Sequence, residues 1–146
     1  MRWLPRRCSS RREDARVKIL ALDYGSARTG VAVSDPTGTL ARPLGVVERA
    51  GAESGLAELE RLAREQEVGR VVVGLPLTLR GTRGEQATET ERFAETLRGV
   101  LDVPVELFDE RFTTDLAQQT GGTAPEDALA AAHLLSTYLE WCAARS

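Results

Sequence analysis

The stretch that decides the fold is ALDYGSARTGVAVS, residues 21–34. Residues 17–23 (VKILALD) form a short apolar run, and a turn that contains glycine separates this run from a second one, GVAVS. Two such runs joined by a short turn predict a β-hairpin. Residues 39–47 (TLARPLGVV) are expected to form a third strand, and Pro43 favours an edge or irregular position because proline cannot donate to a neighbouring strand. The chain therefore opens with a three-strand meander.

Beyond the meander, the hydrophobic period alternates between helix and strand. An amphipathic helix is expected from Ser54 to about Gln66, ended by Gly69, and RVVVG and VELF are expected to be buried strands. A second helix is expected to bury a face of Thr90, Phe93, Ala94, Leu97 and Leu101, and a short helix is expected over residues 114–120. A last helix is expected from Thr123, where Thr123 and Glu126 have the spacing of a capping box, and Asp127, Ala131, Leu134 and Tyr138 share one of its faces. This order predicts an α/β domain with a mixed five-stranded sheet flanked by helices.

Length and composition fit one domain. The chain has 146 residues, 42% of them apolar, and it contains no apolar run near the roughly 18 residues that a membrane span needs. Residues 1–16 carry six arginines against two acids and are interpreted as a disordered basic extension of a 17–146 domain. Cys8 and Cys142 lack CxxC or Cys/His ligand spacing, so neither a disulfide framework nor a zinc site is expected, and a cytoplasmic location is the simple interpretation.

Three carboxylates occupy positions at which chemistry is expected. Asp23 ends a buried strand at a glycine turn, Glu110 ends a second strand that is expected to lie next to the first, and Asp127 lies at the start of the last helix. If they converge, each raises the pKa of the others unless a cation neutralises them, and hard oxygen ligands favour Mg²⁺ or Mn²⁺. Each residue also has a structural interpretation: a turn former, an ion-pair partner of Arg111, and a residue that favours the helix dipole.

Four segments together resemble one known family. ALDYGSARTGVAVS, VVVGLPLTLRGTRGEQA, FDERFTT and EDALAAAHLLSTYL, in this order, are similar to the YqgF (RuvX) family of bacteria, described as Holliday junction resolvases or pre-16S rRNA nucleases. The resemblance covers nearly all of residues 18–140. It implies an RNase H-like fold and a metal-dependent nuclease whose three acidic residues fall on Asp23, Glu110 and Asp127.

Further residues of these motifs are candidates for substrate binding. Arg28 is expected to contact a phosphate, to pair with an active-site carboxylate, or to support its turn. Arg80 and Arg83 are candidate phosphate contacts on a loop, although solvated loop charges are the more ordinary explanation for both. Arg111 and Thr113 are expected to orient Glu110 or the backbone. The connection between Glu110 and Asp127 has 16 residues, fewer than the family pattern leads one to expect, so substrate binding is where this chain should differ.

Three functions compete at this point. A nuclease is expected to act on nucleic acid, with RNA favoured and structured or single-stranded DNA left open, and the resemblance favours the 5′ end of pre-16S rRNA. DYGSARTG also looks like the first phosphate loop of actin and sugar-kinase-type ATPases, but one short domain cannot form their two-domain cleft. A non-catalytic ribosome-assembly or transcription factor is the third alternative. No membrane partner is expected, and a monomer and a homodimer are both compatible with the sequence.

Overall fold

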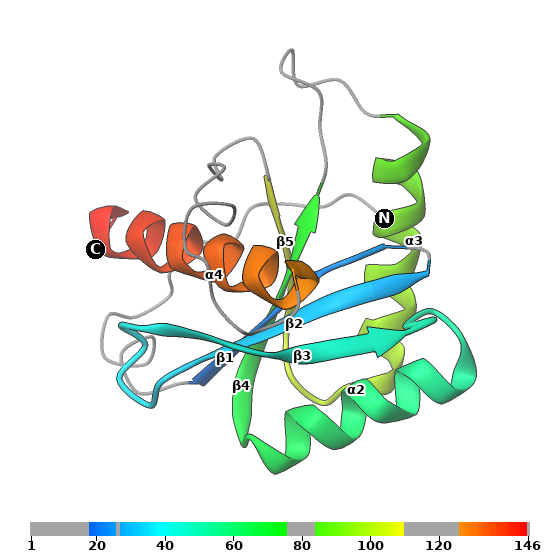
Figure 1. Cartoon of the computed structure of the whole chain (residues 1–146), viewed down its shortest axis with the longest axis horizontal. Coiled ribbons are helices and arrows are strands. Elements are labelled where there is room, and N and C mark those ends of the chain that lie inside the picture. Colours follow the sequence, from blue (N-terminus) through cyan, green and yellow to red (C-terminus); the bar gives the residue numbers. More distant parts are fainter. Residues whose placement is uncertain (1–17, 26, 76–83, 110–125, 146) are drawn as a thin grey trace.

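The computed structural model describes residues 18–25, 27–75, 84–109 and 126–145 (Figure 1). The elements follow in the order β1 (Lys18–Asp23), β2 (Arg28–Ser34), β3 (Ala41–Glu48), α2 (Glu53–Glu65), β4 (Val68–Leu75), α3 (Glu85–Val100), β5 (Val105–Asp109) and α4 (Glu126–Arg145). The expected short helix at residues 114–120, the expected helix start at Thr123 and the basic extension 1–16 all lie outside the described residues, so these three remain predictions.

The five strands form one mixed sheet with the order β3-β2-β1-β4-β5. β1 pairs antiparallel with β2, and β2 with β3, whereas β1–β4 and β4–β5 are parallel pairs. The α/β class and the opening meander are therefore confirmed. One detail was wrong: β5, which precedes Glu110, is separated from β1 by β4. A central strand has a neighbour on each side. The apolar pattern of the sequence does not tell which of the buried strands lies next to β1.

β3 lies at the edge of the sheet, as Pro43 predicted. Gly45 pairs with Val31 but Pro43 pairs with Ala32, so the register shifts between Val31 and Ala32. This irregularity accommodates the proline, which has no N–H to donate to the ladder.

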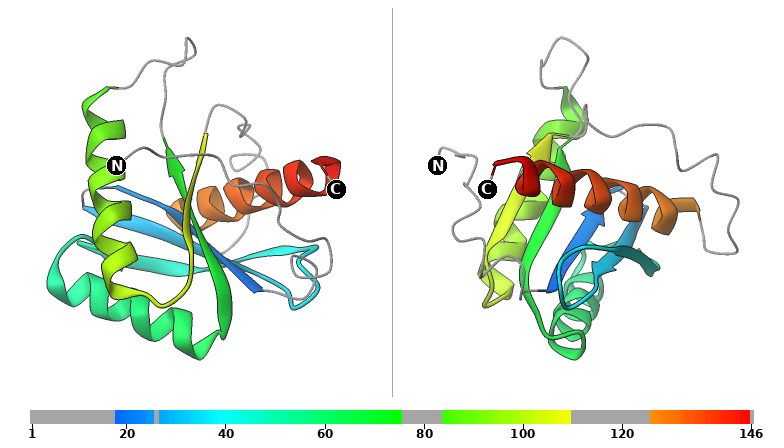
Figure 2. Two further views of the ribbon diagram at one scale, coloured as in Figure 1. Left: turned by 180° about the vertical axis from the view of Figure 1, so that it is seen from behind. Right: turned by 90° about the vertical axis from the view of Figure 1, so that its left-hand side faces the viewer.

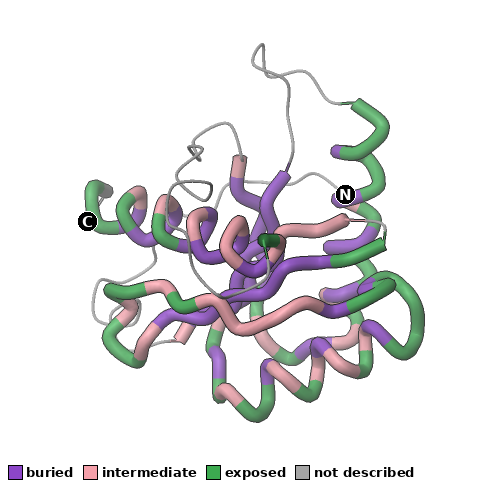
Figure 3. The backbone as a smooth tube through the Cα atoms, in the orientation of Figure 1, coloured by how far each residue is buried: buried purple, intermediate pink, exposed green. Residues whose placement is uncertain are grey.

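Helices cover both faces of the sheet. α2 and α3 lie on one face and α4 crosses the other, as the two further views show (Figure 2). The buried residues are concentrated in the sheet and on the sheet-facing sides of the helices (Figure 3). Along β1, Leu20 and Leu22 belong to the core under α2 and α3, and Ile19 and Ala21 belong to the core under α4. Because side chains alternate along a strand, Asp23 projects on the α4 face.

The described helices agree with the predicted periodicity. Every residue of the face predicted for α3 is buried, and so are Ala131, Leu134 and Tyr138 on α4. The end of α2 is a correction. Glu67, with φ of 53°, takes the left-handed conformation after the helix, and the predicted terminator Gly69 lies inside β4.

Two further findings bear on the expectations from composition. No helix among the described residues is long and apolar enough to cross a membrane. Cys142, near the end of α4, is disulfide-bonded. No disulfide framework was expected, because Cys142 lies in no CxxC or Cys/His ligand spacing.

Candidate active site

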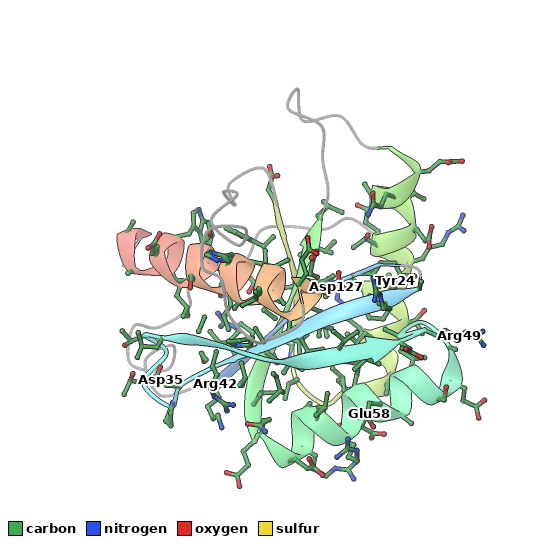
Figure 4. The ribbon with its side chains drawn as sticks, viewed as in Figure 1. Tyr24, Asp35, Arg42, Arg49, Glu58 and Asp127 are labelled. Carbon is green, nitrogen blue, oxygen red and sulfur yellow. The ribbon has the colours of Figure 1, made fainter. Side chains whose placement is uncertain are left out.

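The candidate site lies where the parallel strands end. β1 ends at Asp23, and the last residues of β4 and β5, Leu75 and Asp109, are paired with each other. In open α/β sheets, ligands bind at the carboxyl ends of the parallel strands. The first turn of α4, which contains Asp127, reaches the same end of the sheet, and Figure 4 shows Asp127 there with Tyr24.

Gly30 brings Asp127 next to Asp23. On the hairpin, Asp23 of β1 is the direct partner of Gly30 of β2. A Cβ at position 30 would overlap the main-chain oxygen and carbon of Asp127, so only glycine fits beneath this turn of α4. The absent side chain lets the backbone of Asp127 rest directly on the strand. Two half-buried carboxylates that are 104 positions apart in the sequence thus flank one glycine on the same face.

Arg28 supplies a positive charge at the same place. It begins β2, two residues before Gly30, and therefore projects on the same face of the sheet. Its Nε lies 3.4 Å from Oδ2 of Asp127, with the two side chains 64% and 38% exposed. Of the alternatives left open for Arg28, the described contacts contain an ion pair with a carboxylate, that of Asp127.

The turn between β1 and β2 is closed by contacts between Gly25 and the first two residues of β2. A Cβ at Gly25 would lie 2.5 Å from the carbonyl oxygen of Arg28, and the buried Thr29 hydroxyl lies 3.4 Å from both the amide nitrogen and the carbonyl oxygen of Gly25. These contacts close the turn tightly. The main chain around Asp23 and Arg28 is therefore held in place while both side chains reach solvent.

Tyr24 lies next to the candidate site, and the sequence predicted no role for it. Its ring stacks on Phe93 of α3, with ring centroids 4.4 Å apart, and its hydroxyl donates to Glu89 at 3.4 Å. Burial, and then the charge of Glu89, raise the pKa of Tyr24 above its ordinary value. Tyr24 thus fixes the end of β1 to α3 on the face opposite Asp23. The sequence did contain a signal, namely an aromatic residue directly after Asp23, the acid that ends β1.

The other predicted site residues fall outside the described part of the chain. These are Glu110, Arg80, Arg83, Arg111 and Thr113. The alternation along β5 is nevertheless informative, since Glu106 and Phe108 face α4 while Leu107 belongs to the core under α2 and α3. Asp109, the last residue of β5, has the parity of Leu107 and therefore lies on the side of the sheet opposite to Asp23.

The described donors fit a hard divalent cation. Asp23 and Asp127 offer carboxylate oxygens, the ligands that Mg²⁺ and Mn²⁺ prefer. Both residues lie on the α4 face, at the end of the sheet where the parallel strands finish. No group of three or more His, Cys, Asp or Glu with metal-binding geometry occurs within the described ranges. The third predicted ligand, Glu110, lies outside those ranges.

Sequence comparisons agree with the motifs. The model of the family described as RuvX, Holliday junction resolvase, matches residues 17–141. A protein of Chloroflexus aurantiacus named "Putative pre-16S rRNA nuclease" is 46% identical over 131 residues, which cover 84% of this chain and 86% of the relative. A protein of the same name from Syntrophomonas wolfei is 36% identical and covers 85% of this chain and 94% of its own length.

Solved structures show the same fold. RuvC of Thermus thermophilus in complex with a Holliday junction substrate has a TM-score of 0.58 at 17% identity, covering 86% of this chain and 96% of RuvC. Fowlpox virus resolvase in complex with Holliday junction DNA has a TM-score of 0.51 at 12% identity, covering 85% and 97%. The fold is RNase H-like, as expected, and the chain belongs to the RuvX family of nucleases.

Proposed function

We propose that this nuclease hydrolyses phosphodiester bonds with Mg²⁺ or Mn²⁺ held by Asp23, Glu110 and Asp127, and that its substrate is the 5′ end of pre-16S rRNA. The observation that carries the proposal is the contact between Gly30 and the backbone of Asp127, directly opposite Asp23. This packing supports a site shared by the two acidic residues at the end of the parallel strands. Two adjacent, half-buried carboxylates repel each other unless a cation neutralises them.

Each ligand would come from a different part of the fold. Asp23 is contributed by the first strand of the hairpin and Asp127 by the first turn of α4, and both are on the α4 face. Glu110 is the residue directly after β5 in the sequence. When bound, such ions activate a water molecule and stabilise the leaving oxygen of a phosphoryl displacement.

The chain's own contribution is to fix the ligands and to hold the substrate. The tight Gly25 turn and the Tyr24–Phe93 stack fix the end of β1, so Asp23 has little main-chain freedom. We assign phosphate contacts to Arg28, Arg80 and Arg83. Arg111 directly follows Glu110, Thr113 lies three residues after it, and both would orient Glu110.

RNA is the preferred substrate in this proposal because of the named relatives. Two relatives that are 46% and 36% identical over most of their lengths carry a name that specifies pre-16S rRNA. Maturation of this RNA places the protein in the cytoplasm. The location thus follows from the substrate and no longer from the cysteines.

A junction-resolving DNA nuclease is the second candidate, supported by the family description. Cutting a four-way junction symmetrically needs two active sites and hence a dimer. Leu40, at 68% exposure, is the only strongly exposed large apolar side chain in the part of the chain that is described, so an apolar dimer surface is not evident there. We therefore place RNA first.

The proposal is tested by cleavage with the full-length chain. Three labelled substrates are compared in Mg²⁺, Mn²⁺ or EDTA: an RNA that carries the 5′ extension of small-subunit rRNA, single-stranded DNA of the same sequence, and a four-way DNA junction. We expect metal-dependent cleavage of the RNA. Because even substitutions around metal ligands cost about 10- to 100-fold, Asp23→Asn should lower the rate at least about 100-fold.

The matched control is Asp102→Asn, which removes an exposed carboxylate in the connection between α3 and β5. It should cleave like the wild type. Cleavage that survives Asp23→Asn would show that the site is wrong, and preferential junction cutting would favour the second candidate. A chain that binds RNA but cleaves none of the three substrates would be a non-catalytic binding factor, and stabilisation by nucleotide alone would favour an ATPase.

A further inference from the structure

The main chain of Arg28 is held in place, whereas its side chain extends into solvent. Its Cα is held by pairing with Glu48 of β3 and by the close approach of Gly25 to its carbonyl oxygen. Its side chain is 64% exposed, and the ion pair with Asp127 is the only one recorded for it in the described ranges. Arg28 can therefore change its partner without moving the strand.

We propose that Arg28 and the divalent metal exchange places on Asp127, and that the displaced guanidinium then binds a phosphate of the nucleic acid. This inference rests on the proposed function, because it needs Asp127 as a metal ligand. It goes beyond that function by coupling metal binding to substrate binding through one side chain.

Electrostatic repulsion between the guanidinium and the metal ion favours the exchange. The guanidinium nitrogen lies 3.4 Å from Oδ2 of Asp127, so a divalent ion on the same carboxylate would be within a few ångströms of another positive charge. Like charges at such a separation repel strongly, even at the intermediate dielectric of a protein surface. The two cations therefore compete for this carboxylate.

Exposure makes the release easy. An ion pair in which both partners are more than one third exposed contributes little, because water screens it and because two side chains must be held in one geometry. A metal ion that gains ligands from Asp127 and Asp23 gains more than Arg28 loses. Without metal, Arg28 neutralises Asp127 and limits its repulsion with Asp23.

The released side chain has a suitable target. A scissile phosphate must come next to the carboxylates that hold the metal, and the Arg28 side chain leaves β2 on the same face, two residues from the Gly30 contact. A guanidinium binds phosphate oxygens with two parallel hydrogen bonds, which a lysine ammonium cannot do. The same arginine thus serves the site in both states.

The exchange is tested by measuring metal and RNA affinities separately. Mn²⁺ is titrated calorimetrically into the wild type, Arg28→Ala and Arg42→Ala. Arg42 is the matched control, since it is an exposed arginine on β3 at the far end of the sheet (Figure 4). RNA affinity is measured by fluorescence anisotropy of a labelled single-stranded RNA with Ca²⁺ in place of Mn²⁺, and a gel confirms that the RNA stays intact.

The two affinities should change in opposite directions. Losing the competing cation should tighten Mn²⁺ binding about two- to five-fold, the fold-change of an exposed ion pair. RNA binding should weaken, and the slope of its logarithm against the logarithm of salt concentration should become shallower by about 0.7, the value for one phosphate contact on a single strand. Arg42→Ala should change neither the Mn²⁺ affinity nor this slope.

Other outcomes overturn the exchange. If Arg28→Ala weakens both affinities, the arginine has a structural role, and if only RNA affinity falls, it binds phosphate without competing with metal. If Mn²⁺ binds tighter but RNA affinity is unchanged, the displaced arginine does not contact the substrate. A wild type that binds no Mn²⁺ contradicts the proposed function itself, which distinguishes that failure from failure of the exchange.

Discussion

Two arginine–carboxylate pairs involve or contact α4, and the two pairs differ in burial. At the N-terminal end, Arg28 Nε lies 3.4 Å from Asp127 Oδ2, with side chains 64% and 38% exposed. Nearer the C-terminal end, Arg70 Nη1 lies 3.9 Å from Glu106 Oε1, with side chains only 11% and 3% exposed. Tyr138 of α4 joins the second pair, since its hydroxyl accepts from Arg70 at 2.9 Å and donates to Glu106 at 2.6 Å.

Similar chemistry therefore serves two purposes. A buried charge that loses its partner is costly, so the Arg70–Glu106–Tyr138 network fixes α4 on β4 and β5. An exposed pair is cheap to break, so Arg28 and Asp127 are free to take other partners. One end of the helix is anchored, and the other end presents its carboxylate to solvent and ligands.

The largest effect on stability is expected for Glu106→Ala. Removing one member of a buried ion pair costs about 3–5 kcal/mol, which corresponds to a fall in Tm of about 10 °C or more for a chain of this size. Thermal unfolding followed by circular dichroism measures it. Glu58→Ala is the control, because Glu58 pairs with Arg61 on the exposed side of α2, and Tm should hardly change. Equal shifts for both variants would remove the distinction between buried and exposed pairs.

Gly30→Ala should have the next largest effect, at the opposite end of α4. The new Cβ must displace the backbone of Asp127, and overpacking of this kind costs about 1–3 kcal/mol. Gly45→Ala on the neighbouring β3 is the control, because nothing lies within 4 Å of its Cβ position. Urea unfolding of both variants is the measurement. If Gly30→Ala is as stable as Gly45→Ala, α4 does not rest on Gly30 as described.

Alkaline pH should affect the buried network. Burial, and then the charge of Glu106, raise the pKa of Tyr138 well above its ordinary 10.0. A group with a raised pKa in the folded state contributes stability that is complete below its unfolded pKa and is lost as pH rises toward the folded value. The free energy of unfolding should therefore fall above pH 10, and the fall should be shallower in Tyr138→Phe. Tyr24→Phe should change this slope less, and an unchanged slope in Tyr138→Phe would contradict the assignment.

The smallest effect on stability is expected for Asp127→Asn. The pair that it breaks is exposed, so the free energy of unfolding should change by no more than about 1 kcal/mol. Urea unfolding measures this change, and the same preparation should have lost its metal-dependent cleavage. A large destabilisation would mean that Asp127 helps to hold α4 in place, as Glu106 does.

Much of the sheet could be predicted because its signals are local. The apolar runs around DYGSARTG predicted the hairpin, Pro43 predicted the edge strand, and helical spacing predicted the buried faces of α3 and α4. Strand order depends on packing between distant segments, and the insertion of β4 between β1 and β5 was missed. The positive φ of Glu67 was also missed, because glycine is the usual residue at such a position.

The site was predicted less completely than the fold. Asp23 and Asp127 lie at the same end of the sheet and Arg28 pairs with Asp127, but their role in a metal site stays a prediction. The resemblance, and not the periodicity, selected these two acids. The buried network was missed because Arg70 and Glu106 lie in segments that were interpreted as apolar strands. A charged residue on the core-facing parity of each strand was the signal, since such residues are seldom buried without a partner.

The most direct test of the account is whether Asp23 and Asp127 hold the same metal. Mn²⁺ affinity is measured for the wild type, Asp23→Asn, Asp127→Asn and the double variant, which forms a double-mutant cycle. Each single change should lower the Mn²⁺ affinity at least about tenfold, and the double variant should lose much less than the two losses combined. Losses in free energy that simply add, or a loss for only one of the two residues, would show that they do not share a metal site.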